Sequence, residues 1–132
     1  MTYVYSSGNP PSFYIEAGED LVEGDLVKIS SGTAVKVTAA SDVPIGVVLE
    51  GANSGDQVEI AIEGVVNVRS KGSVTYAFGD KVYVDDGVDG AVSKTSSSAI
   101  NVGKYVGKDL TTSANGDLIP VYISFVDKEQ TG

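Results

Sequence analysis

The sequence predicts an all-β domain that is built from two similar units and preceded by an extended N-terminal arm. Valine is the most frequent residue and leucine is scarce, and a side chain branched at Cβ favours strands over helices. Apolar and polar residues alternate at period two in short segments bounded by Gly, Asp, Asn or Ser, which is the pattern of half-buried strands. The length of 132 residues fits one domain.

Residues 1–20 differ in character from the rest of the chain. Aromatic residues are concentrated there, and Pro10-Pro11 fixes φ, removes two amide donors and holds the chain extended. We therefore expect residues 1–20 to form an arm outside the central sheet, and residues 21–132 to form a barrel-like domain. A disordered terminus is the alternative interpretation, although disordered tails are usually poor in aromatic residues. The segment has no basic part and no apolar signal core, so we expect a protein made and used without secretion.

Nine short segments have the composition and the alternation of strands. Their period-two pattern predicts that one face of each strand is buried and the other faces solvent. No segment has a convincing helical stripe, and residues 71–78 and 96–100 are the best candidates for a helical turn. The expected strands are residues 25–30, 34–38, 45–49, 57–62, 65–70, 81–85, 91–94, 100–106 and 118–125.

An internal repeat orders most of these strands into two similar units. In each unit one Gly-Asp pair precedes the first strand and another precedes the last. Glycine permits the positive φ of a tight turn, and the Asp side chain can bond its own backbone two residues on, so we predict structural turns at all these pairs. Two such units make a pseudo-symmetric barrel or sandwich, and a closed barrel would leave no exposed edge. The pairs are Gly24-Asp25, Gly55-Asp56, Gly79-Asp80 and Gly116-Asp117.

The composition excludes several kinds of chemistry. The chain has no Cys, His or Trp, which rules out disulfides, thiolate metal sites and Ser-His or Cys-His nucleophiles. A net charge of −9 disfavours nucleic acids and anionic membranes, because both would repel the protein. Lys81 and Lys104 occupy solvent-facing strand positions, where they serve solubility rather than catalysis. We expect no enzyme activity and no cofactor, which leaves a binding or structural module.

The densest group of carboxylates is Asp85, Asp86 and Asp89, between two expected strands. A Ca²⁺ loop of the helix-loop-helix kind that began at Asp85 would place Ser96 at its twelfth position. Serine cannot supply the bidentate ligand that is needed there. We interpret the segment as a solvated turn, with a weak surface Ca²⁺ site as the alternative.

Three segments carry a resemblance to a known family. They are Gly-Val-Val-Leu-Glu at residues 46–50, Gly-Asp-Gln-Val-Glu-Ile-Ala-Ile-Glu-Gly-Val at residues 55–65, and Phe-Gly-Asp-Lys-Val-Tyr-Val-Asp-Asp-Gly at residues 78–87. Together they resemble the small capsid cement, or head decoration, proteins of tailed bacteriophages. Val84 stands where many members have an aromatic residue. The resemblance extends over residues 21–125 and includes no catalytic signature.

The resemblance implies a compact β-barrel-like domain of the β-tulip kind, seated as a homotrimer on the outer surface of an icosahedral head. At three-fold and local three-fold positions it would bind the major capsid protein and stabilise the mature shell. The resemblance also implies an arm that reaches over the capsid or a neighbouring protomer. The rigid side chains of the arm would make these contacts: Tyr3, Tyr5, Pro10, Pro11, Phe13 and Tyr14.

A β-structured module of a virion fibre or surface array, which binds a receptor or glycan, is the alternative function. Sugar-binding modules usually stack aromatic faces on the ligand, and the chain has no Trp. Tyr83, Tyr105 and Tyr122 lie in expected strands, where they face the core or a neighbour. The lack of clustered exposed aromatic residues outside the arm therefore favours the cement function.

Overall fold

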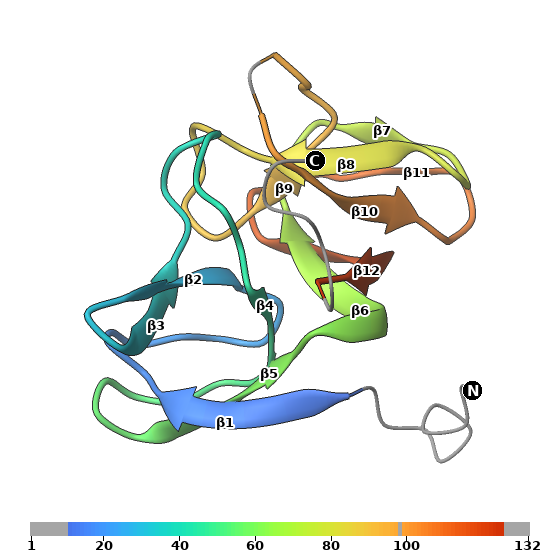
Figure 1. Ribbon diagram of the computed structural model, residues 1–132. Helices are drawn as coiled ribbons and strands as arrows, with labels where there is room; N and C mark the ends of the chain where they lie inside the picture. The colour runs from blue at the N-terminus through green and yellow to red at the C-terminus, as the bar shows by residue number, and fades with distance from the viewer. Residues whose placement is uncertain (1–10, 98, 126–132) are drawn as a thin grey trace.

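The computed structural model describes residues 11–97 and 99–125. Within these ranges the chain forms twelve strands and no helix (Figure 1). The first half of the chain makes one five-stranded sheet, and the second half makes a closed five-stranded barrel beside it. The sheet contains β1 (Ser12–Glu16), β2 (Leu26–Ser30), β3 (Thr33–Lys36), β4 (Gly46–Glu50) and β5 (Gln57–Ala61). The barrel contains β6 (Glu63–Ser70), β8 (Lys81–Val84), β9 (Val92–Ser93), β10 (Asn101–Tyr105) and β12 (Asp117–Ser124).

The two halves share one pairing order. The sheet runs β1-β5-β4-β2-β3, and the barrel runs in the corresponding order β6-β12-β10-β8-β9. A parallel pair between Ser70 and Val92 joins the first and last barrel strands. A parallel bridge between Ala17 and Ala34 lies at the matching place in the sheet, so the sheet curls toward the same closure. The two units expected from the Gly-Asp repeat are thus seen in the strand pairings.

Strand β1 corrects one prediction. Residues 12–16 do not lie outside the sheet, as we expected of the arm, but form its edge and pair antiparallel with β5. The physical reason is alternation: Phe13 and Ile15 point inward and pack against a cluster of buried residues. β1 precedes Gly24-Asp25 as β6 precedes Gly79-Asp80, so it is the opening strand of the first unit. Residues 1–10 of the expected arm lie outside the described residues.

The segment at residues 71–78 also differs from its prediction. A helical turn was the candidate there, but the segment contains β7 (Thr75–Tyr76), which pairs with β11 (Leu110–Thr111). Tyr76 is fully buried and stacks on Tyr105, with ring centroids 5.2 Å apart. Burial of a large aromatic ring outweighs the local preference for a turn. The described part of residues 96–100 is not helical either.

The core has two parts, which meet between the sheet and the barrel. The inward faces of the sheet bury one cluster that includes Val27, Val48 and Ile60. The barrel interior forms the other cluster, and Leu26, Val47 and Ala61 extend it from the opposite face of the sheet. Successive residues of a strand point to opposite faces of the sheet. Near the junction both faces are therefore buried, one in each cluster, and this burial holds the two units together.

The four Gly-Asp pairs form the predicted turns. Each of the four glycines has a φ between 91° and 98°, which only glycine adopts without strain. The Asp bonds differ from the prediction, because in three of the four turns the carboxylate accepts from an amide three residues earlier rather than two residues later. The chain reverses before each Asp, and this brings the earlier amide to the carboxylate. The observed pairs are Asp25 with Val22, Asp80 with Ala77 and Asp117 with Ala114.

Asp25 has a further role that links the two units. Its side chain is fully buried, and its Oδ1 lies 2.7 Å from Nη1 of Arg69 in β6. Its Oδ2 accepts from the Val22 amide at 2.8 Å. The Arg69 amide donates to the Gly24 carbonyl at 2.9 Å. The opening turn of the first unit is thereby fixed to the opening strand of the second.

We expect Asp25→Ala to destabilise the protein by about 3 kcal/mol, because it leaves the part-buried Arg69 guanidinium without its counter-charge. The Val22 amide would also lose its acceptor. The matched control is Asp80→Ala at the equivalent turn of the second unit, where the carboxylate is more exposed and the loss should be clearly smaller. Urea unfolding at pH 7 measures both. Equal losses would show that the Asp25–Arg69 pair does not secure the junction.

Candidate functional site

Of the predicted contact residues that the structure describes, Tyr14 is exposed, while Pro11 and Phe13 are half-buried. Phe13 is partly buried and packs against the sheet core. The Pro11 carbonyl accepts from the Ile62 amide at 3.0 Å, which ties the start of the described chain to the β5–β6 connection. Tyr14 is 66% exposed and presents its ring on the outer face of the sheet. Tyr3, Tyr5 and Pro10 lie outside the described residues.

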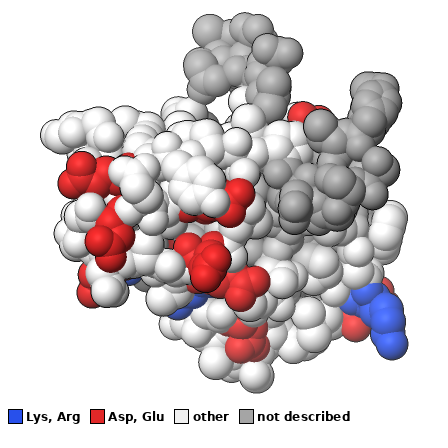
Figure 2. Space-filling view, turned by 90° about the horizontal axis from the view of Figure 1, so that it is seen from below, with Lys and Arg blue, Asp and Glu red and all other residues white. Residues whose placement is uncertain are grey.

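Tyr14 belongs to an acidic row, which we define as Tyr14, Glu59 and Glu50. These residues lie opposite one another across β1, β5 and β4. Glu59 accepts from the Ser12 hydroxyl at 2.5 Å and from the Tyr14 hydroxyl at 3.3 Å. The negative charge of Glu59 raises the pKa of Tyr14, with smaller effects from desolvation and Glu50. Figure 2 shows Asp and Glu side chains gathered on the face where β1 lies, with far fewer Lys or Arg.

A basic row lies on the outer face of the barrel, and we define it as Lys81, Lys104, Tyr122 and Val65. The strand register places them side by side across β8, β10, β12 and β6. Both lysines are exposed, as the alternation predicted, while Tyr122 is 42% and Val65 59% exposed. A hollow of about 270 Å³ lies beside the lysines. The Tyr122 hydroxyl donates to Glu63 at 3.5 Å, so one carboxylate borders the row.

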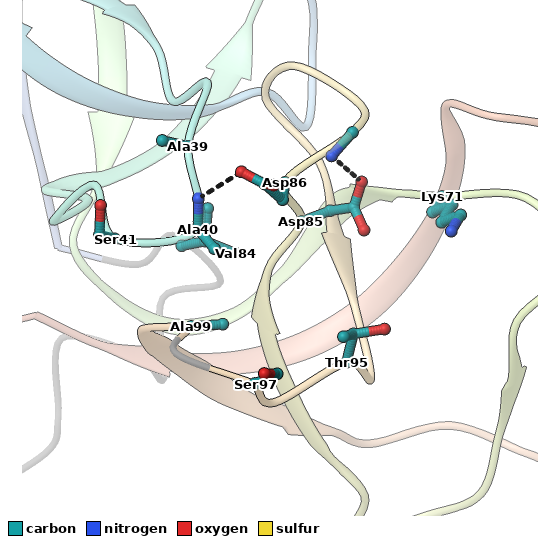
Figure 3. Close-up of a pocket in the computed structure, with 11 residues that line it drawn as sticks. Ala39, Ala40, Ser41, Lys71, Val84, Asp85, Asp86, Thr95, Ser97 and Ala99 are labelled. Atoms are coloured by element: carbon teal, nitrogen blue, oxygen red, sulfur yellow. Dashed lines mark hydrogen bonds between the residues drawn. The ribbon is translucent and has the colours of Figure 1, made fainter.

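A larger hollow of about 540 Å³ lies between the two units (Figure 3). The Ala40 amide donates to Asp86 Oδ1 at 3.1 Å and joins its two walls. Asp85 is 5% exposed, so this part of the turn is not solvated as we predicted. Its Oδ2 accepts from the Gly87 and Val88 amides at 2.9 and 2.8 Å. Both carboxylates therefore accept hydrogen bonds from backbone amides. Among the described residues, no group of three potential ligands could hold a metal ion.

These features describe a protein that acts by contact. The described residues place carboxylates, lysines and tyrosines in rows on sheet faces, where they can meet the complementary surface of another protein. The part of the chain that the structure describes contains no helix able to cross a membrane. Sequence reasoning missed both rows, because each row depends on the register of strands far apart in the chain.

The fold and surface define a β-structured binding protein made of two related units. A family model of phage cement proteins matches residues 6–123, and the chain belongs to that family. It is therefore a structural component of the phage virion head that associates with the capsid, and it is not an enzyme. The resemblance that the three sequence segments indicated is confirmed.

A solved structure has a similar fold. It is the base of a head fibre, gp8.5 N base, from bacteriophage phi29, with a TM-score of 0.60 and 20% sequence identity. The similarity covers 91% of this chain and 98% of that chain. At this identity the likeness is one of fold alone. A search among curated proteins found no match.

One wall of the larger hollow depends on Asp42. Its Oδ2 accepts from the Thr38 amide at 2.8 Å, from the Ala39 amide at 3.0 Å and from Lys28 Nζ at 2.9 Å. These interactions, the Thr38 amide first, lower the pKa of Asp42 from 3.8 to about 2. In its ionised form, the Asp42 carboxylate therefore holds the loop after β3 in place.

Acid should weaken this loop. Because folding lowers the pKa of Asp42, its contribution is present above pH 3.8 and is lost as the pH falls through about 2. The free energy of unfolding of the wild type should therefore fall by about 2 kcal/mol more than that of Asp42→Asn between pH 5 and pH 2. Urea titrations across this range measure the difference. Asp89→Asn, which changes an exposed carboxylate, is the control and should lose as much stability as the wild type between pH 5 and pH 2. An equally large loss in Asp42→Asn would contradict the prediction.

Proposed function

We propose that the chain is a decoration protein that binds the outer surface of the mature icosahedral head as a homotrimer at three-fold positions. There it stabilises the shell by contacts with the major capsid protein. The observation that carries this proposal is the family match, which begins at residue 6 and includes both units. The charged outer faces of the sheet and barrel support it, since they suit contact with a protein surface.

The proposed mechanism is thermodynamic. A protein that binds the mature shell and not its precursor stabilises the mature state by mass action. Three linked copies raise the effective concentration of each contact once the first contact has formed. A trimer would have a net charge of 3 × −9 = −27. Such a charge favours solubility and directs binding toward basic patches of the shell.

The N-terminal segment is the proposed capsid contact. The chain enters the sheet at Ser12, so residues 1–10 would extend from an edge strand with a fixed position. Tyr3 and Tyr5 would supply rigid rings, and Pro10-Pro11 would lower the entropy lost on docking. A deletion that tests this segment must end at residue 10, because loss of residues 12–16 would remove β1 and its inward side chains.

Deletion of residues 1–10 should abolish or strongly weaken co-sedimentation with DNA-free expanded heads of the phage whose genome encodes the protein. Deletion of residues 126–132 is the matched control and should leave binding intact. The wild type should pellet saturably, at about one copy per major capsid subunit for a trimer on every three-fold position. Full binding by the shortened chain would remove residues 1–10 from the mechanism.

Absence of the wild type from the pellet at every salt concentration would contradict the decoration function itself. The favoured function would then be the alternative, a fibre or surface module. That function requires measurable affinity for a glycan or a cell envelope. Thermal unfolding of each deletion variant separates a lost contact from a lost fold.

Head binding should also weaken as salt rises. Electrostatic contacts between exposed charges are screened over a Debye length that falls from roughly 10 Å at 0.1 M to 3 Å at 1 M. We expect the bound fraction of the acidic wild type to decrease steadily between these concentrations in the co-sedimentation assay. Binding that is constant or stronger at high salt would show that apolar contacts dominate.

A further inference from the structure

We propose that copies of this chain associate through their two rows, with the acidic row of one copy docked on the basic row of the next. The inference rests on the proposed function, because it names the surfaces that would hold the proposed trimer together. It is argued from the register, exposure and charge of the described strands.

Each row contains a pair of like charges in direct opposition. Glu50 lies across from Glu59 on β4 and β5, and Lys81 lies across from Lys104 on β8 and β10. Like charges directly opposite on neighbouring strands destabilise a sheet. None of these residues takes part in a salt bridge among the described residues. A partner with the opposite charge would relieve each repulsion, and every copy of the chain presents both signs.

The two rows cross equivalent strands of the two units. Tyr14, Glu59 and Glu50 follow the order β1-β5-β4, while Val65, Tyr122 and Lys104 follow the corresponding order β6-β12-β10. Counted from the Gly-Asp turns, Tyr122 lies two residues further along β12 than Glu59 does along β5. Each row contains an exposed tyrosine, and the rows differ in the sign of their charge. Tyrosines of this kind anchor protein interfaces, and the charges select the opposite row.

Contact between two different surfaces is head-to-tail. Such contacts form a closed ring when the rotation between neighbours closes, and a ring of three would be the proposed trimer. Glu63 is the feature that opposes the contact, because it lies beside Tyr122 at the border of the basic row. The two lysines outnumber it, so the row keeps a net positive charge.

Charge reversal with complementation tests the contact. Lys81→Glu with Lys104→Glu gives a chain with two acidic rows, and Glu50→Lys with Glu59→Lys gives a chain with two basic rows. Each variant alone should be monomeric by light scattering after size-exclusion chromatography, with self-association weakened at least about tenfold. An equimolar mixture should associate again, because a contact between the two variants joins opposite charges. A ring of three cannot alternate two variants, so the mixture should form dimers or even-membered rings rather than a trimer.

Lys71→Glu with Lys108→Glu is the matched control. Both residues are exposed and lie outside the basic row, and the change alters net charge equally, from −9 to −13. This variant should associate like the wild type. Circular dichroism checks the fold of the basic variant, which loses the acceptor for Ser12 and Tyr14, while the lysine variant changes only exposed side chains.

Three results would overturn the inference: a wild type that stays monomeric, a lysine variant that associates normally, or a mixture that fails to assemble. Failure of the proposed function is distinguishable, because head binding is measured by co-sedimentation and association is measured on the free protein. A measured mass of two chains for the wild type would be consistent with the row-to-row contact but would contradict the trimer.

Discussion

The buried carboxylate of Asp25 fixes how the two units of this protein sit against each other. It binds the amide that closes its own turn and the guanidinium of Arg69 in the opening barrel strand. Gly90 approaches it so closely that a Cβ there would lie 2.9 Å from Asp25 Oδ1. A charge in this position is stable only while its partners stay in place. The angle between the sheet and the barrel, and hence between the acidic and basic rows, depends on this contact.

Repetition of the unit explains how one small chain presents two different surfaces. Inward positions are constrained by packing, so both units keep Val, Ile and Ala there and preserve one strand order. Outward positions have no such constraint, because alternate strand residues point away from the core. Glu59 and Tyr122 lie on the equivalent strands β5 and β12 and give their outer faces different chemistry. Change of the outer face alone therefore yields complementary surfaces on one fold.

Local pattern predicted most of the strands and all four Gly-Asp turns, because alternation and positive φ are encoded within a few residues. Strand β1 was missed because Pro10-Pro11 and the aromatic residues suggested an arm, although the repeat itself leaves a place for an opening strand. The rows could not be predicted in this way. Lys81 meets Lys104 only through a pairing with an irregular register, and Glu50 meets Glu59 only past another irregularity. Contacts of this kind depend on tertiary register, which local sequence does not specify.

The position of β1 bears on how a decoration protein could transmit load. In the proposed arrangement residues 1–10 grip the shell, and any pull on them reaches the fold at Ser12. β1 pairs with β5 over its whole length, and Phe13 and Ile15 anchor β1 by packing against the sheet core. The Pro11–Ile62 hydrogen bond also ties the entry point to the connection between the two units. Force would therefore enter at the junction of sheet and barrel, where the shared core and the Asp25–Arg69 pair resist separation. A flexible tail attached to a loop would dissipate that force by local unfolding.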